Sequence, residues 1–230
     1  IFSGNVAAFL GGAIYTQSMD EEVLIANSSF SGNEATYGSG GAIYNAGDDD
    51  VNVVNSVLWN DSPDEIGIFP GAGDMVVTES MIMGNVPALA TDGGGNMDTG
   101  HSYVDPLGDD GILGTLDDNL RLSPTSPAIE AGASMLPSDE NDIDGDGDTD
   151  EPTPIDLDGH DRVRDADGDG VAEVDMGAYE AAEAASPCTG DTNGDGVVSV
   201  DDLIALISAW GPNPGHPADF DGDDVVDVDD

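Results

Sequence analysis

The sequence feature that most constrains the fold is an internal repeat of about 28 residues. The tetrapeptide Phe2–Asn5 recurs letter for letter as Phe30–Asn33, and the pentapeptide Gly11–Tyr15 recurs as Gly40–Tyr44. A unit of this length cannot bury its own apolar side chains, so successive units must stack and bury a shared core. The start of the chain is therefore predicted to be an array of stacked rungs.

Weaker copies of the unit continue the repeat toward residue 100. Taking Phe2, Phe30, Leu58 and Ile82 as equivalent positions gives successive steps of 28, 28 and 24 residues. Within each unit the apolar residues fall in short alternating runs bounded by Gly and Asn, which indicates strands and not helices. Strands of adjacent rungs would then pair in parallel, about 4.8 Å apart.

The repeated residues also resemble a known family. The combination of Phe2–Asn5 with Gly11–Tyr15 is similar to the repeat of polymorphic outer-membrane proteins and autotransporter passengers. The resemblance covers about residues 1–100 and implies a right-handed parallel β-helix. Because this scaffold carries adhesins, lyases, hydrolases and inert stalks, the resemblance implies a fold but no single activity.

Beyond residue 100 the repeat gives way to a different segment. The order Asp105–Leu107, Leu120–Gly132 and Val174–Glu180 resembles the C-terminal end of bacterial secreted β-helix repeat proteins, which forms the last rungs and the cap. A terminal rung needs a polar outer face because nothing stacks on it. We expect residues 101–185 to close the solenoid and to contain acidic loops and a linker.

Two acidic, glycine-spaced runs lie inside this segment. Both match the first half of the calcium loop D-x-[DN]-x-[DN]-G, in which side chains at positions 1, 3 and 5 converge and glycine at position 6 allows a sharp turn. Neither run has an acid at position 12, so a site there would be open, weak or completed by other segments. The alternative is a solvated acidic loop without metal. The candidate ligands are Asp142, Asp144, Asp146, Asp165, Asp167 and Asp169.

The strongest functional signal lies in residues 186–230. The loop Asp191–Asp202 has ligand residues at positions 1, 3, 5 and 12, and it leads into Leu203–Trp210, whose apolar residues have helical spacing. Gly211 and Pro212 are expected to end this helix. The loop recurs 28 residues later with Asp224 in place of the glycine at position 6, so the second site is expected to be weaker.

Paired loops that each lead into a helix resemble a type I dockerin, an EF-hand-like module. The resemblance covers residues 188–230 and implies two calcium ions and a helical surface for a cohesin partner. This chain departs from the family at Asp224 and in the second helix, which would follow Asp230. Calcium ligands implied by position are Asp191, Asn193, Asp195, Val197 and Asp202 in the first loop, and Asp219, Asp221, Asp223, Val225 and Asp230 in the second.

Composition excludes several functional classes. Three arginines and no lysine stand against 49 acidic residues, which gives a formal net charge of −46. Nucleic-acid binding needs basic groups, and a P-loop or a Schiff-base enzyme needs a lysine. No stretch approaches the roughly 18 apolar residues of a membrane span. Such charge destabilises a compact state unless cations neutralise it, which favours bound Ca²⁺.

We expect no catalytic site in this chain. The arginines Arg121, Arg162 and Arg164 lie beyond the rungs, and no rung has an Asp pair at matching positions. Inverting glycoside hydrolases need two carboxylates about 6.5–9.5 Å apart. Cys188 and His216 precede the duplicated loops at equivalent positions, which explains them without invoking a nucleophile and its base.

Together these features predict a mainly β protein with three parts. Residues 1–100 form a right-handed parallel β-helix, residues 101–185 form the cap, and residues 186–230 form a truncated dockerin-like module. The predicted function is a calcium-binding extracellular structural or adhesin-like surface protein. Its module would attach it to a cohesin-like or cell-surface protein, and a polysaccharide is a further candidate partner.

Two alternatives stay open. One is the C-terminal part of a dockerin-bearing polysaccharide-degrading enzyme whose active site lies upstream. The other is a calcium buffer without any partner. Since the chain begins inside a repeat, we expect it to be a fragment of a longer protein, and the predicted calcium chemistry implies that this protein is exported.

Overall fold

The computed structural model describes residues 1–17, 22–100, 103–133, 136–183, 198–213 and 225–226. The chain divides into two compact units, Ile1–Glu183 and Ala184–Asp230, which we describe separately.

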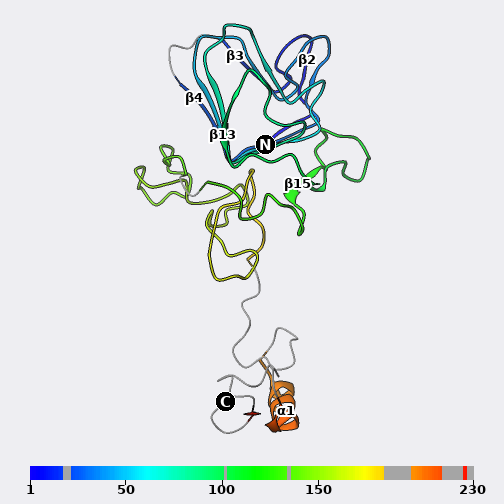
Figure 1. Cartoon of the computed structure of the whole chain (residues 1–230), viewed down its shortest axis with the longest axis vertical. Coiled ribbons are helices and arrows are strands. Elements are labelled where there is room, and N and C mark those ends of the chain that lie inside the picture. Colours follow the sequence, from blue (N-terminus) through cyan, green and yellow to red (C-terminus); the bar gives the residue numbers. More distant parts are fainter. Residues whose placement is uncertain (18–21, 101–102, 134–135, 184–197, 214–224, 227–230) are drawn as a thin grey trace. The chain divides into compact units, whose positions relative to one another are not determined.

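The first unit begins with a β-solenoid of short parallel strands (Figure 1). The first two rungs contain β1 (Phe2–Ser3), β2 (Val6–Ala7), β3 (Ile14–Thr16), β4 (Val23–Ala26), β5 (Ser29–Ser31), β6 (Glu34–Ala35), β7 (Ile43–Asn45) and β8 (Val51–Val54). The next two contain β9 (Val57–Leu58), β10 (Ile66–Ile68), β11 (Met75–Thr78), β12 (Met81–Ile82) and β13 (Thr91–Gly94).

The strand register confirms the predicted repeat steps. Phe2 pairs with Phe30, Phe30 pairs with Leu58, and Leu58 pairs with Ile82, all in parallel. The strands stack into three main sheets, ordered β1-β5-β9-β12, β10-β7-β3 and β13-β11-β8-β4, with β2 and β6 forming a smaller pair. Every rung therefore repeats the same path, as the duplicated motifs predict.

Alternating side chains fill the inside of the solenoid. In β8 and β11 every second residue is buried, so that Val51, Val53, Met75 and Val77 point into the core. Phe30 is fully buried and stacks on Phe2 of the rung before, with ring centroids 4.6 Å apart. The two-residue period of the sequence thus becomes an apolar interior shared by successive rungs.

The corners of the solenoid need backbone conformations with positive φ. Gly4, Gly32, Asn60 and Gly84 occupy equivalent positions and have φ of 64°, 68°, 69° and 86°. Glycine adopts this conformation freely, and asparagine tolerates it better than other residues with a side chain. The Gly and Asn residues that punctuate the repeat are therefore turn-forming residues.

Residues 103–183 pack along the side of the solenoid, against the outer face of the β1-β5-β9-β12 sheet. The Tyr103 hydroxyl donates to the carbonyl oxygens of Phe30 and Val57, at 3.1 and 3.3 Å. Farther along, the Ala178 N–H donates to Ser29 Oγ at 3.0 Å. In Figure 1 the rungs overlie one another, and the green and yellow segment after residue 100 lies to one side of them.

This lateral position differs from the expected stack of last rungs, and it has a physical cause. Val57 and Met81 point outward from β9 and β12, so this sheet is apolar on both faces and its outer face needs cover. The cover consists of Tyr103, Leu120, Leu122, Ala128 and Met176, and it includes an antiparallel pair, β14 (Tyr103–Asp105) and β15 (Asn119–Leu122). We call residues 103–183 the flanking segment.

The second unit contains the predicted helix, α1 (Val200–Ala209). Ser199 caps its N-terminus, and Asp202 completes the capping box by accepting a bond from the Ser199 N–H at 2.7 Å. The helix ends at Ala209, with Trp210 as its C-cap, directly before Gly211 and Pro212, as the sequence predicts. A short antiparallel pair, β16 (Gly211–Pro212) with β17 (Val225–Val226), follows.

Candidate metal-binding loops

The two acidic runs of the flanking segment close in the same way. In the first, Asp142 Oδ1 accepts a hydrogen bond from the Gly147 N–H at 3.0 Å. In the second, Asp165 Oδ2 accepts from the Gly170 N–H, also at 3.0 Å. Each bond joins position 1 of the calcium-loop motif to the glycine at position 6, so the two runs curl into similar loops.

The other motif positions repeat this correspondence. The N–H at position 5 donates to the carboxylate at position 3, from Asp146 to Asp144 at 3.2 Å and from Asp169 to Asp167 at 2.9 Å. Asp146 and Asp169 each accept in turn from the N–H two residues later, at 2.7 and 2.8 Å. The carboxylates are therefore oriented by the backbone of their own loop.

Glycine makes these loops possible. Gly145, Gly147, Gly168 and Gly170 all have positive φ, between 78° and 92°. For Gly145, Gly147 and Gly170 no heavy atom lies within 4 Å of where a Cβ would be. Glycine is therefore favoured there by the backbone conformation, and not by crowding around the position of a Cβ atom.

Three carboxylates predicted in the first run lie together. Asp142, Asp144 and Asp146 bring ligand oxygens within 4.8 Å of one another. Asp144 also belongs to a second group with Asp139 and Glu151, which the sequence analysis did not single out. Asp139 and Glu151 meet because the loop is closed at its base, where the Asp139 N–H donates to the Glu151 carbonyl at 2.8 Å.

Glu151 has the least favourable electrostatic environment described in this loop. Its Oε1 atom is buried and accepts no hydrogen bond. Burial, followed by the negative charges of Asp146, Asp144, Asp148 and Asp139, raises the pKa of the Glu151 carboxyl. A cation among these oxygens would relieve both the repulsion and the missing partner.

In the second run a distant residue completes the cluster. Asp165 and Asp167 lie within 4.8 Å of Glu130, whereas Asp169 is outside this group. Glu130 Oε1 accepts from the N–H groups of Ala166 at 2.6 Å and Asp167 at 3.3 Å. Burial and the Asp167 charge raise the pKa of Glu130. No local motif marks Glu130, because it is 35 residues from Asp165 in the sequence.

A fourth group, Asp156, Asp158 and His160, already has hydrogen-bond donors from the protein. Burial alone would raise the pKa of Asp156, but the N–H groups of Glu180, His160 and Asp158 bond its carboxylate and hold the pKa below its ordinary value. Asp158 makes two bonds to Arg121, at 2.7 and 2.8 Å. These oxygens have donors, which makes the group a structural turn.

The dockerin-like loops fall mostly outside the described residues. Asp202 is described and is buried at the start of α1, and Val225 lies in β17. The remaining predicted ligands cannot be placed, namely Asp191, Asn193, Asp195, Val197, Asp219, Asp221, Asp223 and Asp230.

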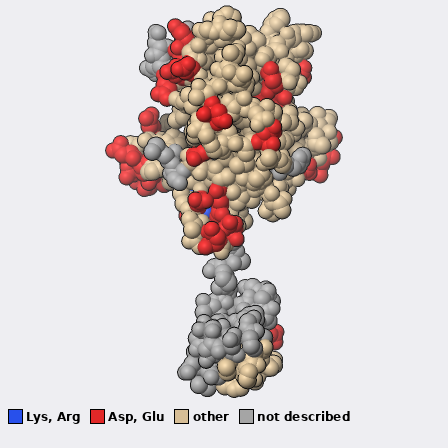
Figure 2. Space-filling model, in the orientation of Figure 1, with Lys and Arg blue, Asp and Glu red and all other residues tan. Residues whose placement is uncertain are grey.

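The three arginines all lie in the flanking segment and pair with acids. Arg121 binds Asp158 and lies 4.4 Å above the ring centroid of Tyr179. Arg162 is buried and binds Glu180 at 2.9 Å. Arg164 lies 4.0 Å from Glu183. Three arginines can pair with few of the 49 acidic residues, and Figure 2 shows acidic residues gathered in patches on the visible face.

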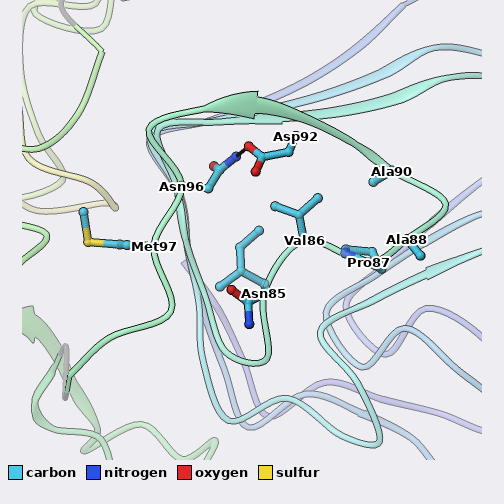
Figure 3. Close-up of a pocket in the computed structure, with 9 residues that line it drawn as sticks. Asn85, Val86, Pro87, Ala88, Ala90, Asp92, Asn96 and Met97 are labelled. Carbon is cyan, nitrogen blue, oxygen red and sulfur yellow. Dashed lines mark hydrogen bonds between the residues drawn. The ribbon is translucent and has the colours of Figure 1, made fainter.

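A hollow of about 190 Å³ at the fourth rung does not have the chemistry of a catalytic site. Figure 3 shows Asp92 at its wall, next to Asn96. Asp92 Oδ1 accepts hydrogen bonds from Asn96 Nδ2 at 2.7 Å and from the Gly94 N–H at 2.9 Å. These donors lower the pKa of Asp92. Asp92 is the one ionisable residue that lines the hollow, so a two-carboxylate hydrolytic mechanism has no second group there.

With the repeat and the loops in view, the comparisons with known proteins become informative. Residues 1–17 and 27–46 match the Chlamydia polymorphic membrane protein repeat. The polymorphic membrane protein repeat thus covers β1–β3, β5–β7 and the corners between them. No curated protein and no solved structure matches the chain. Among the described residues, α1 is the longest helix and is too short to cross a membrane.

Proposed function

We propose that this chain is part of a calcium-binding, surface-exposed structural or adhesin-like protein. The similarity of residues 1–17 and 27–46 to a membrane-protein repeat supports placement at the cell surface. The stacked parallel rungs supply a rigid, elongating scaffold, as expected of a stalk or a binding surface.

The observation that carries the calcium proposal is the shared geometry of the two acidic loops. Both bind the carboxylate at position 1 to the N–H of the glycine at position 6, and both gather three carboxylates within 4.8 Å. Ca²⁺ takes six to eight hard oxygen ligands, which carboxylates, backbone carbonyls and water supply together. The extra acids Glu151 and Glu130 take the place of the absent acid at position 12.

The dockerin-like unit is proposed as the attachment point. Leu203, Ile204, Ile207 and Trp210 lie along one face of α1, and each is more than half exposed. An exposed apolar stripe on a helix favours docking to a partner, here a cohesin-like or cell-surface protein. The proposal of a polysaccharide partner is supported by the β-solenoid scaffold alone.

The alternative of a polysaccharide-degrading enzyme gains no support from the described rungs. The acidic pair Asp61 and Glu65 of the third rung is buried, so little of either carboxyl is exposed to a substrate. This alternative therefore places the active site upstream.

Calorimetric titration of EDTA-treated protein with Ca²⁺ tests the proposal, using the full chain and a chain shortened to residues 1–185. Saturable heat retained by the shortened chain would assign calcium to the loops of the flanking segment. Heat lost on shortening would assign it to the dockerin-like loops. Asp144→Asn should weaken the retained heat, whereas Asp74→Asn, an exposed acid outside the clusters, should not. Absence of heat in both chains would contradict calcium binding.

A further inference from the structure

The third rung contains two buried acids that neither the calcium loops nor the attachment module uses. Asp61 and Glu65 lie between β9 and β10, and they are 4% and 3% exposed. Buried carboxyl groups are rare unless a cation or hydrogen-bond donors compensate them. The arginines of the described residues pair with Asp158, Glu180 and Glu183, so they do not compensate this pair.

Asp61 occupies a position that is asparagine in the two preceding rungs. Asn5 Nδ2 donates to Asn33 Oδ1 at 2.8 Å, which begins a ladder along the solenoid. Asn33 continues it by donating to Asp61 Oδ1 from its backbone N–H at 2.6 Å and from Nδ2 at 2.7 Å. One oxygen of Asp61 is therefore fully engaged as the end of the ladder.

The second oxygens of the two acids have no donor. Asp61 Oδ2 and Glu65 Oε2 are both buried, and within the described residues neither receives a hydrogen bond from an N–H or O–H group. The Asp61 N–H donates to Glu65 Oε1 at 3.2 Å, which holds the two residues together. A buried carboxylate oxygen without a donor is costly, and two adjacent ones also repel each other.

A proton resolves both problems. When one carboxyl is protonated, its O–H donates to the carboxylate of the other, and the pair carries a single negative charge. We propose that Asp61 and Glu65 share one proton inside the third rung and thereby tie the asparagine ladder to the turn before β10.

The surrounding charges agree with this assignment. Burial, the bond to Asp61 and the Asp61 charge raise the pKa of Glu65 to about 10, and burial also raises the pKa of Asp61. Burial, and with it the charges of Asp61 and Glu65, raises the pKa of Tyr103 in the flanking segment, and the Tyr103 hydroxyl donates to the carbonyls of Phe30 and Val57 and not to the pair. Asp64 of the same turn accepts from Ser39 and Gly40 of the preceding rung.

The shared proton makes folding depend on pH in a defined direction. The folded chain keeps one proton that the unfolded chain releases once the pH exceeds the ordinary pKa of a carboxyl group. The unfolding equilibrium constant should therefore rise by about tenfold per pH unit from this pair, between about pH 5 and pH 10.

Infrared spectroscopy of the full chain in EDTA tests the proposal directly, because a protonated carboxyl has a carbonyl band distinct from that of a carboxylate. At pH 9, where exposed acids are ionised, wild type should retain a carboxylic acid band. Asp61→Asn and Glu65→Gln should each remove it. Either amide supplies an N–H donor to the remaining carboxylate, and asparagine is the residue of the neighbouring rungs. Glu34→Gln, on the exposed side of β6, should leave the band unchanged.

Denaturation by urea across pH 5–10 gives a second readout. The slope of the free energy of unfolding against pH measures the difference in bound protons between the folded and unfolded chain. In both variants this difference should be about one proton smaller than in wild type. A wild-type spectrum without the acid band at pH 9 would overturn the proposal, even if both variants failed to fold. An acid band or a pH slope that folded variants retain unchanged would overturn it as well.

Discussion

Single residues with unusual backbone angles decide where this chain turns. Asn60 replaces glycine at a solenoid corner with φ of 69°, and the acidic loops have positive φ at four glycines and at Asp142, whose φ is 51°. The same small set of residues thus shapes both the scaffold and the candidate metal loops.

Gly170→Ala tests this requirement in the second acidic loop. The φ of Gly170 is 89°, and a Cβ there meets no other atom, so the cost is conformational, about 1–2 kcal/mol. If Ca²⁺ binds the closed loop, its affinity should fall by about five- to thirtyfold in calorimetry on residues 1–185. Val171→Ala, at an exposed position of the same loop, is the control, and equal affinities of the two variants would contradict the prediction.

Glu180 gives a pH dependence that is separate from the acid pair of the third rung. Burial and then the Asp175 charge raise the pKa of Glu180 to about 8, although Arg162 Nη1 lies 2.9 Å from its Oε1. The folded chain therefore holds a proton that the unfolded chain has lost between about pH 4.5 and pH 8. The free energy of unfolding should fall as pH rises through this window.

Replacing this carboxyl removes its titration. Glu180→Gln keeps an oxygen for Arg162 and should make the decline of stability between pH 5 and pH 8 less steep by about one proton, as measured by urea denaturation, while the contribution of the acid pair of the third rung stays. Asp74→Asn, which changes an exposed acid, serves as the control. A slope as steep in Glu180→Gln as in wild type would show that another group titrates there.

At the scale of elements, the rungs could be predicted because their motifs repeat. The position of the flanking segment could not be predicted, because no repeat defines it. The equivalence of Phe2, Phe30, Leu58 and Ile82 follows from duplicated motifs, and their strands pair at those positions. The lateral position of residues 103–183 depends on contacts far apart in the sequence, such as Tyr103 with Phe30. The adjacent apolar residues Val57 and Leu58 were the available signal, because a strand that is apolar on both faces requires cover on both.

The acidic loops could also be predicted only in part. Local spacing predicts that Asp142, Asp144 and Asp146 converge, and they do. The same spacing predicts Asp169 beside Asp165 and Asp167, but in the structure Glu130 completes that cluster. Glu130 reaches the loop only because the flanking segment folds back on itself, with the Glu130 N–H bonded to Asp175 at 2.7 Å. Motifs define local turns, whereas tertiary packing decides which other carboxylates join each cluster.

Tyr103→Phe measures how firmly the flanking segment is attached to the solenoid. The hydroxyl is buried and donates to two strand carbonyls, one in β5 and one in β9. Its removal should lower the free energy of unfolding by about 1 kcal/mol, since the ring keeps its packing. Tyr37→Phe changes a tyrosine that is 78% exposed and should have no effect in the same urea titration. Comparable losses in both variants would contradict the attachment.

At the scale of the whole molecule, the net charge of −46 predicts that cations stabilise the protein. Repulsion among so many carboxylates opposes the compact state, and three arginines offset little of it. Monovalent salt screens this repulsion over about 10 Å at 0.1 M, but it does not bridge carboxylates within 4.8 Å of one another. Ca²⁺ bound in the loops would do both.

Thermal unfolding of the EDTA-treated chain separates these two effects. Sodium chloride should raise the midpoint gradually through screening, whereas Ca²⁺ should raise it further at constant ionic strength, by saturable binding. At a free Ca²⁺ concentration 100-fold above Kd, one site adds about 2.7 kcal/mol to the free energy of unfolding. Mg²⁺ should stabilise less, because it demands near-octahedral geometry and dehydrates reluctantly. Equal effects of Ca²⁺, Mg²⁺ and sodium chloride at matched ionic strength would mean that charge screening alone stabilises the protein.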